Sequence, residues 1–149
     1  MKRLTVLLIS GIFAMNVFAQ GDGFGVGIIL GEPTGLSAKF WLTDKTAVDG
    51  AIAWSMWNES AIHIHADFLV HSFNLINVSQ GQLPIYFGIG PRIKLAHDPW
   101  FGVRIPIGLD YLFGSAPLDV FFELVPILDL VPGTYFHFNG AIGIRYFFD

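Results

Sequence analysis

The chain has 149 residues, of which 53% are apolar and 13% charged, and its formal net charge is −4. Its length fits one domain, and its apolar fraction is too high for water to be the only expected solvent. The lack of any basic run argues against a nucleic-acid-binding surface, and the lack of cysteine excludes disulfides and thiolate sites. Seventeen glycines and fifteen phenylalanines favour a β-protein.

The first segment of the chain differs in composition from the rest. Two basic residues, Lys2-Arg3, precede an apolar stretch over residues 4–15, and a short side chain follows at Ala19. We predict a signal peptide over 1–19 and a mature domain over 20–149. A membrane-anchoring helix is the alternative, but the apolar stretch is shorter than the ~20 residues that a helical span needs.

The mature chain consists of segments with a sequence period of two, separated by residues typical of turns. Most segments approach the ~9–11 residues that a tilted barrel strand needs to cross a bilayer, and their number is even. We therefore predict an all-β fold: an eight-stranded antiparallel up-and-down transmembrane β-barrel. The predicted strands are Phe24–Leu30, Gly35–Leu42, Thr46–Ser55, Ala61–Phe73, Leu83–Leu95, Phe101–Leu112, Leu118–Leu128 and Phe136–Phe148.

Each predicted strand has one apolar face and one polar face. In the fourth strand, for example, Ile62, Ile64 and Phe68 alternate with His63, His65 and Asp67. A soluble β-sandwich also alternates, but glycine and paired opposite charges on the polar faces suit the narrow lumen of an eight-stranded barrel. The polar network predicted for the lumen comprises Lys39, Asp49, Asp67, Arg92, Lys94, Arg104, Asp110, Asp119, Glu123 and Arg145.

Aromatic residues concentrate near the predicted turns, at both ends of the strands. Two aromatic girdles at the two headgroup levels are typical of a membrane-spanning barrel. The residues predicted to form these girdles are Trp54, Trp57, Trp100, Phe101, Tyr111, Tyr135, Tyr146 and Phe148.

The last strand carries a family resemblance. It reads Ile142-Gly-Ile-Arg-Tyr146-Phe-Phe148-Asp149, with bulky residues at alternate positions and an aromatic next to the end. It resembles the terminal strand of outer-membrane barrels, although members of that family usually end on the aromatic itself. In size the chain resembles the small eight-stranded barrels typified by OmpX and the membrane domain of OmpA. The stretch from Gly31 to Gly35 onward resembles uncharacterised small outer-membrane proteins. The resemblance implies a Gram-negative outer membrane, contact with its lipids, and recognition by the barrel-assembly machinery through the strand ending at Phe148.

Two features inside the predicted strands lead to further expectations. Pro91, Pro106 and Pro126 each remove a hydrogen-bond donor from the sheet, so we expect bulges or local twists there. Turn centres near residues 98, 115 and 133 place Glu123 within one diagonal of both Arg104 and Arg145. We therefore expect Glu123 to be the ionic centre of the barrel.

Two residue sets could support other chemistry. His63, His65, Asp67 and His71 lie on one strand face and could share a metal ion, although a polar lumen explains them equally well, and no metal or cofactor is predicted. His71-Ser72 is the nearest approach to the His–Ser pair of lipid-modifying barrel enzymes, but adjacent strand residues point to opposite faces. We expect a non-enzymatic envelope protein. A narrow channel or small-ligand barrel and a lipid-modifying enzyme are the alternatives.

Overall fold

The computed structural model describes residues 23–32, 34–55 and 60–148. The predicted signal peptide, its cleavage point, Trp57 and Asp149 lie outside these described residues. Within the described ranges, no helix is long and apolar enough to cross a membrane. Nine strands are described: β1 (Phe24–Glu32), β2 (Thr34–Trp41), β3 (Thr46–Ser55), β4 (Ala61–Ser72), β5 (Ile85–Leu95), β6 (Trp100–Arg104), β7 (Ile107–Leu112), β8 (Leu118–Val131) and β9 (Tyr135–Phe148).

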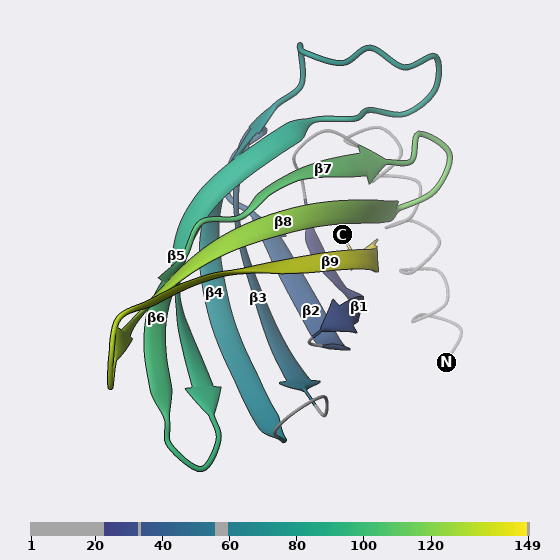
Figure 1. The fold of residues 1–149 in the computed structure, drawn as a ribbon. Coiled ribbons are helices and arrows are strands. Elements are labelled where there is room, and N and C mark those ends of the chain that lie inside the picture. Colours follow the sequence, from purple (N-terminus) through teal and green to yellow (C-terminus); the bar gives the residue numbers. More distant parts are fainter. Residues whose placement is uncertain (1–22, 33, 56–59, 149) are drawn as a thin grey trace, which may run out of the picture.

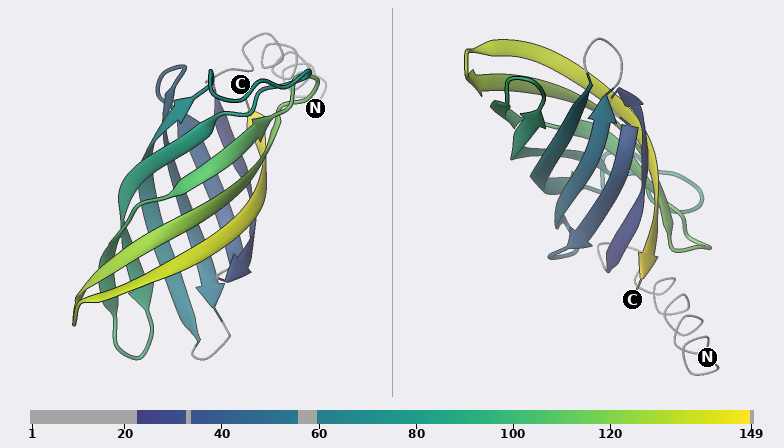
Figure 2. Two further views of the ribbon diagram at one scale, coloured as in Figure 1. Left: turned by 45° about the horizontal axis from the view of Figure 1, so that its top comes forward. Right: turned by 90° about the horizontal axis from the view of Figure 1, so that it is seen from below.

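These strands form one closed antiparallel sheet (Figures 1 and 2). Apart from β6 and β7, each pairs with its neighbour in sequence, and β9 returns to pair with β1. β6 and β7 are two parts of one strand, because both lie between β5 and β8. The ring therefore has eight strands, which confirms the predicted eight-stranded up-and-down barrel.

The strand ends differ most from the prediction at the β8–β9 hairpin. We expected a break from Asp129 to Tyr135, but β8 continues to Val131 and β9 begins at Tyr135. Asp129 pairs directly with Tyr135, so the turn contains only residues 132–134. Both strands are 14 residues long, and the hairpin extends past the end of β1, whose last partner on β9 is Gly140.

The expectation of bulges or local twists at the three prolines is wrong as regards bulges, because the register does not shift at any of them. The β4–β5 register is the same on both sides of Pro91, and Pro126 pairs with Phe138 within an unbroken β8–β9 register. Pro106 separates β6 from β7, yet its carbonyl still accepts a hydrogen bond from Gly88 N, at 3.0 Å. A proline can therefore omit one donor without displacing its neighbours. The register shift within β6 lies between Phe101 and Gly102 instead.

Side chains alternate between the two faces of the closed sheet, as the period of two predicts. The outer face carries large apolar residues in every strand, such as Ile52, Phe68 and Phe122, which are exposed. The inner face carries most of the buried charged residues, including Lys39, Asp119 and Arg145. Charge therefore lies inside the ring and apolar surface outside it, the reverse of a soluble protein.

The lumen also contains apolar layers that the sequence analysis did not separate from the polar face. Trp41, Ala47, Leu112 and Phe147 form a buried cluster at the end where the described chain starts and stops. A second cluster, deeper in the lumen, combines Ile29, Ala51, Leu69, Tyr86 and Phe121. The lumen is thus a packed core, with ionic residues embedded between apolar ones.

Candidate functional site

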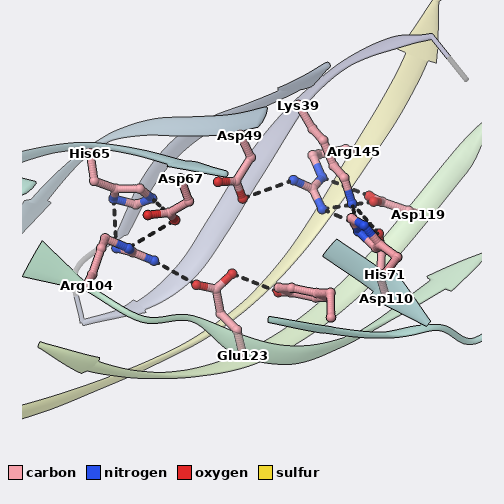
Figure 3. Close-up of polar contacts among 11 residues, drawn as sticks. Lys39, Asp49, His65, Asp67, His71, Arg104, Asp110, Asp119, Glu123 and Arg145 are labelled. Carbon is pink, nitrogen blue, oxygen red and sulfur yellow. Dashed lines mark hydrogen bonds and ion pairs between the residues drawn. The ribbon is translucent and has the colours of Figure 1, made fainter. Parts of the chain in front are cut away.

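The candidate site is the set of charged side chains inside the barrel. Strands β2 to β9 each contribute at least one member, and period two points all of them inward. Nine of the ten predicted network residues are buried, whereas Lys94 is half-buried and lies opposite His63 in the β4–β5 register. The members contact one another in three groups, and Figure 3 shows the first two of them.

The first group surrounds Arg145 and lies nearest the end of the barrel where the described chain starts and stops. Arg145 donates two hydrogen bonds to Asp119, at 3.0 and 2.9 Å, and its guanidinium carbon lies 4.1 Å from the centre of the Phe121 ring. Lys39 Nζ donates to Asp110 Oδ2 at 2.7 Å, and neither side chain is exposed. The aromatic face contributes a cation–π contact that replaces part of the lost hydration of Arg145.

The second group is centred on Arg104. Its Nη2 donates to Glu123 Oε2 at 2.8 Å, and Tyr86 donates its hydroxyl hydrogen to Glu123 Oε1, also at 2.8 Å. Its Nη1 donates to His65 Nδ1 at 2.8 Å, while its Nε lies 3.1 Å from Asp67 Oδ2. A single guanidinium therefore joins β4 to β8 across the lumen.

The third group lies at the opposite mouth of the barrel, around Arg92. Arg92 donates two hydrogen bonds to Asp129, at 3.0 and 2.7 Å, and one to His63 Nδ1, at 3.2 Å. His137 Nε2 lies 2.9 Å from Asp129 Oδ2, and the His137 side chain is 38% exposed. Water therefore reaches this group more readily than the other two.

Glu123 is not the shared centre of two arginines that we expected. It contacts Arg104, but among the described ion pairs Arg145 contacts Asp119, Asp49 and Asp110 instead. The reason is register: Arg145 lies directly opposite Asp119 on β8, and Glu123 lies opposite Ala141. The prediction placed the centre of this turn at residue 133, whereas the β8–β9 register places it at residue 132. A shift of one residue in the turn centre changes the partner of every residue in the hairpin by two positions.

The four residues considered together as metal ligands are not all brought together. His63 accepts a hydrogen bond from Arg92, and His71 Nε2 accepts one from Lys39 at 2.7 Å. His65 and Asp67 do lie close to each other, with 3.7 Å between Nε2 and Oδ2. Asp49 joins them as a third group with ligand atoms within 4.8 Å of the other two.

The structure does not assemble a His–Ser catalytic pair at His71-Ser72. Lys39 donates to one ring nitrogen of His71, and the other nitrogen donates to the carbonyl of Lys45 at 3.0 Å. The ring therefore has no free nitrogen to accept a proton from a hydroxyl. A cavity of about 600 Å³ against β1–β4 is lined by Ser37 and His65 among mainly apolar residues, and no hydrogen bond joins the two within the described chain.

Of the predicted girdle residues that the structure describes, five lie on the outer face near the two rims and two do not. Trp54, Phe101 and Phe148 are exposed on the outer face, and Tyr146 packs edge-on against Phe148 at 5.0 Å between ring centres. Tyr111 shares the outward parity of Leu109. The two that do not are Trp100 and Tyr135, which pack edge-on with 5.3 Å between ring centres. Their partners in register, Lys94 and Asp129, belong to the lumen face. These two rings therefore lie at the lumen mouth and not on the lipid side of the rim.

Sequence reasoning missed three members of the network. Asp129 follows the predicted end of its strand, His137 lies beside the same expected turn, and Tyr86 is absent from the predicted network. The alternation of faces along the strand already indicated Asp129. Asp119, Glu123 and Asp129 all have odd residue numbers in one strand and therefore share one face. Extending the predicted strand by three residues would have found Asp129 and, opposite it, the start of β9.

Comparison with known proteins identifies the fold. No family model matches the chain, and no curated protein matches it in sequence. Among solved structures, the chain is similar to the N-terminal β-barrel domain of Pseudomonas aeruginosa OprF, with a TM-score of 0.62 and 13% sequence identity over 85% of this chain and 97% of that one. Since so low an identity establishes only the fold, the conclusion is that this chain shares the small β-barrel fold of the OprF N-terminal domain.

Proposed function

We propose that the protein is an integral outer-membrane β-barrel of a Gram-negative-type envelope, with a lumen filled by polar side chains and a non-enzymatic role in envelope structure or surface contacts. The observation that carries this proposal is the inverted distribution of polarity. Large apolar side chains are exposed around the whole ring, while nine of the ten predicted charged residues are buried within it. A soluble monomer rarely exposes apolar surface on this scale.

Lipid is the occupant that suits the outer face. A closed sheet leaves no unpaired strand edge between its strands, so its backbone polar groups need no water. Trp54 and Phe101 at one rim and Tyr146 and Phe148 at the other mark two levels at which amphipathic rings can meet headgroups. The terminal strand, β9, would present its alternate aromatic side chains to the assembly machinery.

The packed lumen favours a structural role over that of an open channel. Arg145, Arg104 and Arg92 each bridge strands by ion pairs within the lumen. Small barrels of this strand number are filled by their own side chains. Purified protein in planar bilayers should therefore show no stable porin-sized conductance, and reproducible passage of sugars into liposomes would contradict the filled lumen.

Fractionation and gel migration test the location directly. The mature protein should begin at Gln20, occur in the outer-membrane fraction, and migrate differently when it has not been heated, because a closed barrel resists detergent. Ile105→Arg, on the outer face, should weaken insertion by about 2–4 kcal/mol if it lies near the bilayer centre; Ile105→Leu is the matched control. Recovery from the periplasm as a soluble protein without heat-dependent migration would refute the proposal.

A further inference from the structure

The charges inside the barrel do not balance. The described residues include six buried carboxylates and four buried cationic side chains, which leaves two negative charges in excess. The carboxylates are Asp49, Asp67, Asp110, Asp119, Glu123 and Asp129, and the cations are Lys39, Arg92, Arg104 and Arg145. A buried charge is costly unless it is paired, so the excess must be compensated at a definite place.

The excess is located at Asp49 and Asp67. The other four buried carboxylates each have a cationic nitrogen at 2.7–2.9 Å. The nearest cationic contact of Asp49 is Arg145, at 3.8 Å, and Arg145 is already bound to Asp119. Asp67 is 1% exposed; Arg104 Nε lies 3.1 Å from its Oδ2, but that guanidinium is already bound to Glu123, and neither oxygen of Asp67 accepts a hydrogen bond. Asp49 Oδ1 accepts none either.

The two carboxylates also face each other. Asp49 and Asp67 are direct partners across the β3–β4 pair, where like charges destabilise a sheet. His65 lies two residues along β4 on the same face, and each of the three residues offers a ligand atom within 4.8 Å of the others. A cation between the carboxylates would turn this repulsion into attraction.

We propose that Asp49, His65 and Asp67 form a binding site for one divalent transition-metal ion such as Zn²⁺. Carboxylate oxygen and imidazole nitrogen bind Zn²⁺ at about 2.0–2.2 Å, so three such ligands can surround one ion at the spacing observed here. The imidazole favours a transition metal over Mg²⁺ or Ca²⁺, which prefer oxygen ligands alone. The His65 side chain is 11% exposed while Asp67 is inaccessible, so the ion reaches the site on the histidine side.

Arg104 competes with the ion for the same atoms. It donates to His65 Nδ1, so a neutral ring carries its proton on Nε2, the nitrogen nearer Asp67. For Nε2 to bind the metal, this proton must move to Nδ1, and Arg104 must leave His65. Arg104 can keep its hydrogen bond to Glu123 through Nη2. The guanidinium and the metal ion are therefore alternative counter-charges for Asp67.

This competition gives two variants with opposite expected effects. Asp67→Asn and Arg104→Gln remove the two partners of one ion pair, so both should lower barrel stability. Asp67→Asn should weaken Zn²⁺ binding by about tenfold or more, as should His65→Gln, whereas Arg104→Gln should tighten it. Asp129→Asn is the matched control, because it makes the same carboxylate-to-amide change in the group around Arg92, which offers no ligand atom to the site, and should leave the affinity unchanged.

The measurement is calorimetric titration of Zn²⁺ into chelator-treated protein without a histidine tag, folded in detergent and checked for β-structure by circular dichroism. Wild type should bind one ion per chain. Mn²⁺ should give the electron-paramagnetic-resonance signal of a bound ion, and Zn²⁺ should abolish that signal by displacing the Mn²⁺.

Because the test uses folded protein in detergent, its outcome is independent of the cellular location. An absence of saturable binding by wild type would show that protons shared by Asp49 and Asp67 supply the missing charge, and equal affinity of wild type and Asp67→Asn would place the ion elsewhere. Either result overturns the proposal.

Discussion

The two ends of the lumen hold similar ion pairs in different surroundings. At the end near the first and last described residues, Lys39 and Asp110 are fully enclosed, and Trp41, Leu112 and Phe147 cover them. At the opposite mouth, Arg92 and Asp129 also pair at 2.7 Å, but their neighbour His137 is 38% exposed. The comparison leads us to expect that solvent access, more than contact distance, sets how much each pair contributes to the stability of the fold.

The difference follows from the strands that build each end. At the terminal end, the inward positions of β2, β7 and β9 are occupied by large apolar residues, which pack together. At the other end, β8 and β9 extend beyond β1, so residues 135–139 of β9 pair with β8 and have no partner on β1. The inward positions there include the small residues Gly35, Ala53 and Ala61. The mouth is consequently open to water.

The largest effect is expected at the enclosed pair. Asp110→Ala should lower the free energy of unfolding by about 3–5 kcal/mol, because it leaves the Lys39 ammonium buried without its counter-charge. Asp110→Asn should be milder, since the amide oxygen still accepts a hydrogen bond. The urea midpoint of protein folded in lipid vesicles measures both. A wild-type midpoint for Asp110→Ala would mean that water reaches this end after all.

The apolar cover gives a second, smaller effect. Leu112→Ala should destabilise the barrel by about 2–3 kcal/mol, in the lower part of the range for buried leucine because the site lies at a rim. It should also admit water to Lys39 and Asp110. Adding Asp110→Ala to Leu112→Ala should then cost less than Asp110→Ala alone, and a double-mutant cycle measures that coupling. Strict additivity would show that the cover does not keep the pair dry.

The open mouth should respond less. Asp129→Ala removes a two-bond contact with Arg92, and we expect a loss of about 1–3 kcal/mol, typical of hydrogen bonds to charged groups, because Arg92 can recover hydration through the open end. The loss should depend on salt more than the loss for Asp110→Ala does, since salt screens charges more strongly where water enters. A loss equal to that of Asp110→Ala, and insensitive to salt, would remove the distinction between the two ends.

The sequence predicts the faces of the barrel better than its contacts. Period two is a property of any strand, so the inward positions of Arg104, Glu123 and Arg145 follow from local pattern alone. Which carboxylate meets Arg145 depends on the turn centre of the β8–β9 hairpin, and an error of one residue replaced Asp119 with Glu123. The facing of Asp49 and Asp67 across β3–β4 likewise depends on register, which no single strand reveals.

The smallest effect on stability is expected at His137, whose side chain makes a short contact but is exposed to solvent. Its Nε2 lies 2.9 Å from Asp129 Oδ2, a distance as short as those in the buried pairs, yet more than a third of its side chain is exposed. Exposed polar contacts, ion pairs included, contribute about 0–1 kcal/mol, because water and salt screen the attraction and the side chain loses rotational freedom. His137→Ala should therefore change the free energy of unfolding, obtained from the urea midpoint, by less than about 1 kcal/mol, and Arg92 should still hold Asp129 by two hydrogen bonds.

His71→Ala is the informative counterpart. His71 contacts Lys39 at a similar 2.7 Å but is 2% exposed, so its loss leaves an ammonium with one partner fewer in a dry site. If the two histidine variants lose equal stability, distance and not solvent access governs these contacts, and the contrast between the two ends of the lumen fails.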